Sequence, residues 1–253
     1  MVPGERRPEL TRILLLNANT SAAITAKLVA AAEAQAPSVV WIGATGRFGA
    51  AYIASRSAAA IAAHAALDAL AAAPPGHHGV LLGCFGDPGL DALKEVAGVP
   101  VQGLGEASAS VALRAAARFS VVTGGAAWGP MLREFYAARG LGDRLASVRT
   151  VAPTGAEIAA APEAALALLA AEARAAATAD GAGAVVLGGA GLAGLAPAVA
   201  ARAGVPVLCS LACGVAEILA AVAAPAAPRV TEQAALGGLS LELQTFLTMT
   251  PTA

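Results

Sequence analysis

The sequence predicts an α/β fold of two pseudo-symmetric, doubly wound lobes, each with a roughly four-stranded parallel sheet flanked by helices. Short uninterrupted apolar segments alternate with alanine-rich segments along the 253-residue chain, as is typical of parallel strands that helices cover on both faces. The chain also repeats itself. Residues 79–90, GVLLGCFGDPGL, are matched by residues 184–195, AVVLGGAGLAGL, and each copy continues to Gly-Val-Pro-Val, at residues 98–101 and 204–207.

Apolar runs in the first half predict four strands, at residues 13–16, 39–42, 80–82 and 99–102. Thr20 or Ser21, just after the first run, is a suitable N-cap for a helix that reaches about Ala36. A second helix is expected over about residues 57–73, because Pro74-Pro75-Gly76 ends it.

The second half follows the same plan. Strands are expected at residues 119–122, 147–151, 185–187 and 205–208, and helices near residues 130–139 and 162–179. We therefore expect the first lobe to comprise residues 1–114 and 217–253, and the second lobe residues 115–216. A last helix, after about Gly237, is expected to pack back on the first lobe.

Composition excludes several classes of protein. A net charge of −1 and only 13% charged residues provide no basic surface for nucleic acid and no charged face for a membrane. The uncharged run between Asp180 and Arg202 has the length of a membrane span, but six glycines and a proline divide it into strand, turn and helix. The first residues lack the apolar segment of a secretory signal, and the cysteine number is odd. We therefore expect a cytoplasmic protein with free thiols.

The candidate site lies where the strands end, because open parallel sheets bind ligands beyond the carboxyl ends of their strands. The duplication should bring four such strand ends together around one cleft between the lobes. The expected substrate-binding residues at these ends are Asn17, Asn19, Thr20, Phe85, Gly86, Thr123, Gly124, Gly188, Gly189, Ala190 and Gly191.

Cys84 is the candidate catalytic residue. Asp87-Pro88 resembles an N-cap followed by a proline in the first helical turn, so we expect the thiol to lie at a helix N-terminus. That position lowers a cysteine pKa and favours the thiolate as base or nucleophile. The alternative interpretation is a small buried apolar side chain.

The other strand ends offer neutral polar groups. Amide and hydroxyl groups of Asn17, Asn19 and Thr20 suit carbonyl or carboxylate oxygens, although they could instead only cap the helix. Thr123-Gly-Gly125 forms a second small nest for an oxyanion. Arg47 is expected to be the cation that lies closest to these ends, and this scarcity of charge favours a neutral or singly charged substrate over a dicarboxylate.

The remaining chemistry-bearing residues indicate neither a metal nor an organic cofactor. Gly189 to Gly194 matches G-x-G-x-x-G, but the acidic residue that would bind a nicotinamide ribose is missing. Cys209 and Cys213 lack a nearby histidine and are expected in the core, although Cys209 follows a strand and could reach the cleft. Structural or exposed roles are expected for His64, His77, His78 and the helix-start carboxylate Glu106.

Several segments together resemble one family. Leu16-Asn-Ala-Asn-Thr20 is similar to an N-P-N-T motif with alanine in place of proline. The other matching segments are Tyr52-Ile-Ala-Ser-Arg56, Gly83-Cys-Phe-Gly-Asp-Pro-Gly-Leu90, Gly103-Leu-Gly-Glu-Ala107, Val121-Val-Thr-Gly-Gly125 and Leu187-Gly-Gly-Ala-Gly-Leu-Ala-Gly194. They cover nearly the whole chain and resemble the aspartate/glutamate/hydantoin racemase superfamily, in particular its hydantoin racemases.

This resemblance implies cofactor-independent chemistry at a carbon acid, in a homo-oligomer that acts on a small molecule. In the family, one cysteine removes the proton next to a carbonyl and a second cysteine returns a proton from the opposite face. Cys84 matches the first cysteine, whereas Gly189 stands where the second would fall.

Three functions stay open because glycine cannot carry a proton. The first is a racemase or isomerase acting on a 5-substituted hydantoin or a similar compound, with water or Cys209 as the second acid. The second is one-sided chemistry with Cys84 as the only acid, as in a single-cysteine decarboxylase. The third is a protein that binds a small molecule with weak or no racemase activity, and a nicotinamide-binding protein is a more distant alternative.

Overall fold

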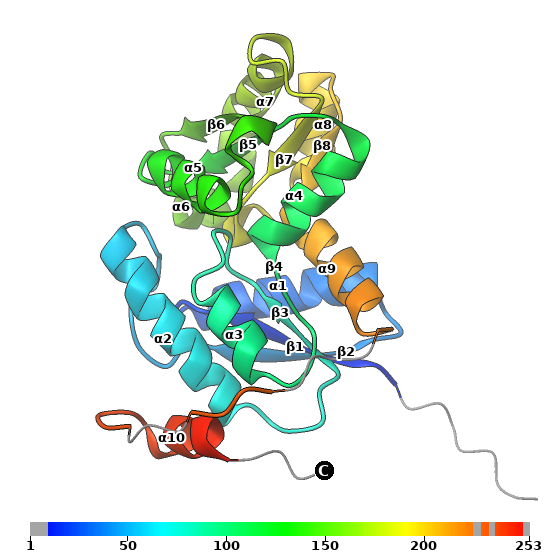
Figure 1. Ribbon diagram of the computed structural model, residues 1–253. Coiled ribbons are helices and arrows are strands. Elements are labelled where there is room, and N and C mark those ends of the chain that lie inside the picture. Colours follow the sequence, from blue (N-terminus) through cyan, green and yellow to red (C-terminus); the bar gives the residue numbers. More distant parts are fainter. Residues whose placement is uncertain (1–9, 225–228, 233–235, 250–253) are drawn as a thin grey trace, which may run out of the picture.

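The computed structural model describes residues 10–224, 229–232 and 236–249, and it has two four-stranded parallel sheets (Figure 1). The first sheet has the strand order β2-β1-β3-β4 and the second β6-β5-β7-β8. The strands are β1 Arg12–Asn17, β2 Val40–Thr45, β3 Gly79–Leu82, β4 Val101–Gly103, β5 Phe119–Gly124, β6 Leu145–Val151, β7 Ala184–Leu187 and β8 Val207–Cys209. The predicted α/β fold with two lobes is confirmed.

Helices flank both sheets. They are α1 Ala22–Gln35, α2 Arg56–Ala72, α3 Leu90–Val96, α4 Leu104–Ala115, α5 Trp128–Ala138, α6 Gly155–Ala160, α7 Pro162–Thr178, α8 Ala196–Ala203, α9 Ser210–Ala221 and α10 Leu241–Thr248. Two 3-10 helices, η1 Gly142–Arg144 and η2 Ala190–Leu192, complete the described elements. Ser21 caps α1 by accepting a hydrogen bond from the Ile24 N–H, as the sequence indicated.

The apolar runs become strands because both faces of each sheet are covered. Ile13, Leu14, Leu15 and Leu16 of β1 are fully buried, and every residue of β3 and β7 is buried. In contrast, the edge strand β2 has exposed positions. Burial on both faces explains why the central strands show no polar alternation in the sequence.

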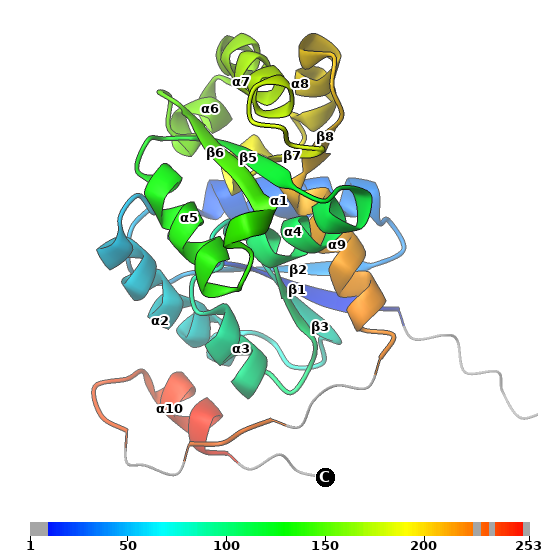
Figure 2. The ribbon, with the colours of Figure 1, turned by 45° about the horizontal axis from the view of Figure 1, so that its top comes forward.

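The two sheets repeat the same pairing, which is the structural form of the sequence repeat. β1 pairs in parallel with β2 and β3, and β5 pairs in the same way with β6 and β7. The second lobe lies above the first in Figure 1, and α4 and α9 lie at the junction in both ribbon views (Figures 1 and 2). The two helices pack against each other, and α4 also contacts β7. The strand ends of both lobes therefore share one space.

The C-terminal segment returns to the first lobe. Helix α10 packs against α2, and the Ser240 hydroxyl donates a hydrogen bond to Asp68 Oδ1 over 2.5 Å. Asp68 also receives two hydrogen bonds from Arg47, at 2.6 and 2.8 Å. The expected boundaries near residues 114 and 217 fall within α4 and α9, and the division into domains stays a prediction. Among the described residues, no helix combines the length and the apolar character needed to cross a membrane.

The predicted helix start at Asp87-Pro88 is wrong. Helix α3 begins at Leu90, and its N-cap is Gly89, in the left-handed region with φ of 77°. Asp87 itself has a φ of 48° and its carboxylate turns away from α3 to accept hydrogen bonds from the N–H groups of Gly105 and Glu106, at 2.8 and 2.7 Å. The local motif therefore serves a different helix, α4, whose N-terminus the carboxylate stabilises.

Candidate active site

A cavity of about 430 Å³ lies between the lobes at the ends of the strands. It brings together residues of all four predicted strand ends, namely Asn19, Cys84, Phe85, Thr123, Gly124, Gly189, Ala190 and Gly191. The other lining residues are Ser21, Ala23, Ile24, Lys27, Ala51, Tyr52, Ile53, Trp128, Gly155, Ala156, Ala159, Ala160 and Leu192. The volume is that of a pocket for a small organic molecule.

The first strand end is organised by two asparagines with different tasks. Asn17 is fully buried and does not line the cavity; its amide nitrogen donates to Asn19 Oδ1 at 2.8 Å and to Thr25 Oγ1 at 3.1 Å. Asn19 Oδ1 also accepts from the Ser21 N–H at 2.9 Å. Within the described residues Asn19 Nδ2 has no partner, so this donor is available to a ligand. Asn17 thus holds Asn19 in place, and Asn19 faces the cavity.

Three other predicted residues lie outside the cavity lining. The Thr20 N–H donates to the Ala50 carbonyl at 3.2 Å. The Gly188 N–H donates to the Val122 carbonyl at 2.9 Å, and a β-carbon on Gly188 would lie 2.5 Å from the Phe85 ring. Gly86 packs under Trp128. These residues support the cavity wall through backbone hydrogen bonds and packing, but they do not line the cavity.

Cys84 lines the cavity, but its environment differs from the prediction. Its side chain is only 6% exposed, and burial, with the charge of Asp87 as a smaller cause, raises the pKa of the thiol to about 12. The expected lowering of this pKa is therefore wrong. The helix that was expected to stabilise a thiolate begins at Leu90, six residues after Cys84. At neutral pH the resting form of Cys84 is the thiol.

Asp87 connects the end of β3 to the start of α4. It is 3% exposed, and burial raises its pKa to about 7 although the two backbone N–H groups act in the opposite direction. The carboxylate fits only because residue 103 is a glycine, since a β-carbon there would clash with Asp87 Cγ. The Gly103-Leu-Gly-Glu106 motif thus provides both the space and the two N–H donors that bind the Asp87 carboxylate.

Replacing Asp87 with alanine is expected to lower the free energy of unfolding by about 2–4 kcal/mol, because it leaves two buried N–H groups without an acceptor. Chemical denaturation followed by circular dichroism measures the change. Asp91→Ala is the matched control, because the Asp91 side chain is 86% exposed, and it should change stability little. Equal stability of the two variants would contradict the assigned role of Asp87.

The second-lobe side of the cavity contains Gly189 where the resemblance places a second thiol. Gly189 has a φ of 128° and a ψ of 137°, a conformation that glycine adopts without strain. A β-carbon there would lie 3.3 Å from Leu192 Cδ1, a tight contact that a small shift of this side chain can relieve, and 3.6 Å from Thr123 Oγ1. The hydroxyl of Thr123 is thus the polar group that lies next to the missing side chain.

Most of the remaining candidates lie elsewhere. Cys209 ends β8, packs against the apolar core and does not line the cavity, and Cys213 is buried in α9. His64 makes an edge contact with the Phe48 ring, and His78 Nδ1 accepts from the Arg12 N–H at 2.9 Å. Glu106 lies in the first turn of α4, as expected, where it pairs with Lys94. His77 is also outside the lining. Among the described residues, no group of three or more metal-ligating side chains is found.

The glycine-rich turn after β7 is explained by packing. A β-carbon on Gly191 would clash with the Gly155 carbonyl, and η2 rather than a long helix follows the strand. This close approach requires glycine at residue 191, whereas Gly189 and Gly194 have positive φ angles.

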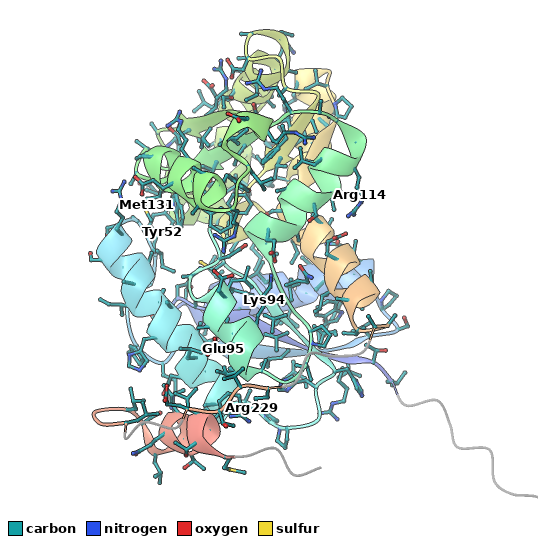
Figure 3. All side chains as sticks on the ribbon, in the orientation of Figure 1. Tyr52, Lys94, Glu95, Arg114, Met131 and Arg229 are labelled. Carbon is teal, nitrogen blue, oxygen red and sulfur yellow. The ribbon has the colours of Figure 1, made fainter. Side chains whose placement is uncertain are left out.

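The sequence analysis missed two cavity residues that connect the lobes. The Tyr52 hydroxyl donates to the Gly124 carbonyl and accepts from the Gly155 N–H, both at 3.3 Å, and Figure 3 shows Tyr52 at the junction of the lobes. The Lys27 ammonium donates to the Gly191 carbonyl at 2.6 Å. The Tyr52-Ile-Ala-Ser-Arg56 motif signalled the first residue, whereas no local signal marks Lys27 among the alanines of α1.

Comparison with known proteins shows the family to which the chain belongs. Residues 13–218 match the Asp/Glu/hydantoin racemase family, so the chain belongs to that family. Within it, the chain is similar to the hydantoin racemase of Paenarthrobacter aurescens, with 34% identity over 83% of this chain and 92% of the relative. It is also 37% identical to the hydantoin racemase of Pseudomonas sp. (strain NS671), over 53% of this chain and about half, 54%, of that relative.

Solved structures give the same result for the fold. The allantoin racemase of Klebsiella pneumoniae is similar, with a TM-score of 0.85 and 30% identity over 92% of this chain and 98% of that chain. Arylmalonate decarboxylase, with a TM-score of 0.65 and 19% identity over 84% of this chain and 92% of that chain, shares the fold alone. These relatives support an isomerase of the hydantoin racemase type.

Proposed function

We propose that this protein is a cofactor-independent racemase of the hydantoin racemase type, which removes the proton from C5 of a 5-substituted hydantoin, or of a similar compound, through Cys84. The observation that carries the proposal is the position of Cys84 in a cavity built from four strand ends, beside neutral hydrogen-bond donors. The buried thiol, once ionised, is a strong base because its pKa is high.

The cavity supplies the groups that the reaction needs. When the thiolate of Cys84 takes the C5 proton, the electron pair moves into the adjacent carbonyl and an enolate oxygen forms. Asn19 Nδ2 and the Thr123 hydroxyl are fixed, neutral donors that can bind this oxygen. The N–H groups that begin η2 add donors, because the first residues of a helix lack partners inside it.

The proton on the opposite face has to come from a group other than residue 189. Cys209 lies outside the cavity lining, so we infer that water held near Thr123 returns this proton. The hydroxide that remains is neutralised through solvent by the proton that Cys84 gives up when it returns to the thiolate. Thr123 Oγ1 lies 3.6 Å from the point that a side chain of residue 189 would occupy first. One-sided chemistry by Cys84 alone is the second candidate function, and the missing thiol at Gly189 favours it. The three unpaired cysteines support a reducing, cytoplasmic location, and the resemblance to the racemase family is the ground on which we also propose a homo-oligomer.

Deuterium exchange at C5 of a single-enantiomer 5-substituted hydantoin in D2O, with optical rotation followed in parallel, tests the proposal. Exchange with loss of rotation is expected for a racemase. Exchange with retained rotation would support one-sided chemistry instead. Absence of both would contradict carbon-acid chemistry on this ring.

The exchange rate is expected to rise with pH. Burial raises the pKa of the Cys84 thiol to about 12, so below that value the thiolate fraction grows about tenfold for each pH unit. Initial exchange rates between about pH 6 and about pH 9 should follow this trend, after subtraction of the rate with a Cys84→Ala variant as the blank. A flat or falling profile would contradict a thiolate base.

A further inference from the structure

Lys27 is the one charged side chain among the described residues that line the cavity. It lies on the same face of α1 as Ala23 and Ile24, which also line the cavity. Its ammonium crosses from the first lobe to the second and donates a hydrogen bond of 2.6 Å to the carbonyl of Gly191. The cavity therefore has a positive charge at the η2 wall.

This charge has no anionic partner within the described part of the chain. Arg47 forms an ion pair with Asp68, Arg149 with Asp180 and Lys94 with Glu106, each at 2.6 Å. Lys27 instead has a neutral carbonyl as its partner. An ammonium carries three donors, so two remain for a ligand. Burial lowers the pKa of Lys27 because no negative charge compensates for the lost hydration.

The surroundings of Lys27 are apolar. The neighbouring cavity residues on α1, α6 and η2 are Ile24, Ala156, Ala159, Ala160 and Leu192. A ligand that binds Lys27 shares the cavity with these aliphatic side chains. The wall thus suits a short hydrocarbon linker, and its one cation suits an anionic end group.

We propose that the cavity selects a ring substrate whose C5 substituent is a short aliphatic chain ending in a carboxylate, and that Lys27 binds this carboxylate. The assignment rests on the proposed function for the ring and adds the class of the substituent. It agrees with the expectation of a singly charged substrate and replaces Arg47, which is engaged by Asp68 and Glu242, as the relevant cation.

The experiment compares matched pairs of substrates that differ only in charge. The probes are hydantoin-5-acetic acid with hydantoin-5-acetamide, and hydantoin-5-propionic acid with hydantoin-5-propionamide. Binding is measured by calorimetry, and C5 exchange gives kcat/KM. For at least one pair, the wild type should bind the acid at least about tenfold more tightly than the amide, as expected for a charge-assisted hydrogen bond.

Lys27→Met should bring the ratio of acid to amide affinity to within about twofold of one, because methionine keeps the unbranched shape and the helix propensity of lysine without its charge. The ratio is the readout, because the variant also loses the hydrogen bond to the Gly191 carbonyl. Lys27→Arg should retain part of the preference. Arg202→Met, which removes a half-exposed cation of α8 outside the cavity lining, should leave the preference unchanged.

Each other outcome has a defined meaning. Equal binding of acid and amide by the wild type in both pairs would overturn the inference, while exchange of the amides would leave the proposed function intact. Tighter acid binding without any exchange would contradict the proposed function and support the role of Lys27. A folded Lys27→Met variant that loses exchange equally with acid and amide would mean that Lys27 acts through its hydrogen bond to Gly191 or in proton transfer, and it would overturn the role of Lys27 in selection.

Discussion

Replacing Cys84 with alanine is expected to lower the rate of C5 exchange at least about 1000-fold, because the cavity then lacks the group that removes the proton. Cys84 is the one cysteine that lines the cavity among the described residues, so another thiol cannot take over without a rearrangement. Exchange of the C5 proton measured by NMR in D2O gives the rate directly.

Cys213→Ala is the matched control for this loss. Cys213 is also buried, at 4% exposure, but lies in α9 away from the cavity lining. The control variant should retain exchange, and circular dichroism should show that both variants are folded. Cys209→Ala tests the relocated second acid in the same assay. Exchange by a folded Cys84→Ala variant at the wild-type rate would remove the catalytic assignment.

Replacing Gly189 with cysteine is expected to raise the rate of racemisation about 100-fold or more, since a positioned acid contributes at least about this factor. A β-carbon at residue 189 would make one tight contact, 3.3 Å to the Leu192 Cδ1 methyl, which has to shift slightly, and one ordinary contact, 3.6 Å to Thr123 Oγ1. The Gly189→Cys substitution is also expected to lower the stability of the fold. A φ of 128° is unfavourable for any residue with a β-carbon, and we expect a loss of about 1–3 kcal/mol.

Gly189→Ala separates these two effects, because it introduces the same backbone strain without a thiol. Both variants should melt at a lower temperature than the wild type, and only Gly189→Cys should racemise faster, as polarimetry would show. Equal racemisation rates of the two variants would mean that the second proton donor does not limit the wild type.

The fold could be predicted from the sequence because it depends on patterns that are local and repeated. The apolar runs around Leu14 and Val186 are buried on both faces, and the repeat of about 105 residues requires two equivalent sheets. The four strand ends met as expected, because the ends of parallel strands share one edge. Cys84, Asn19 and Thr123 were therefore found without any knowledge of tertiary contacts.

The errors arose where a distant contact decides the outcome. Asp87-Pro88 has the pattern of an N-cap, but hydrogen bonding to the N-terminus of α4 takes the carboxylate elsewhere. The pKa of Cys84 was expected to fall for the same reason, whereas burial raises it. Lys27 and Tyr52 reach across to the other lobe. The motif around Tyr52 marked its segment but not its contact with the second lobe, and no pattern marks Lys27.

The burial of the Cys84 thiol also affects how the protein resists oxidation and alkylation. Because burial raises the pKa of the Cys84 thiol far above neutrality, only a very small fraction of the molecules carries the reactive sulfur anion at neutral pH. Peroxide and alkylating reagents attack that anion, so the unliganded protein should withstand oxidants that inactivate acidic cysteines. A thiol with a high pKa should therefore resist oxidation by air while no substrate is bound.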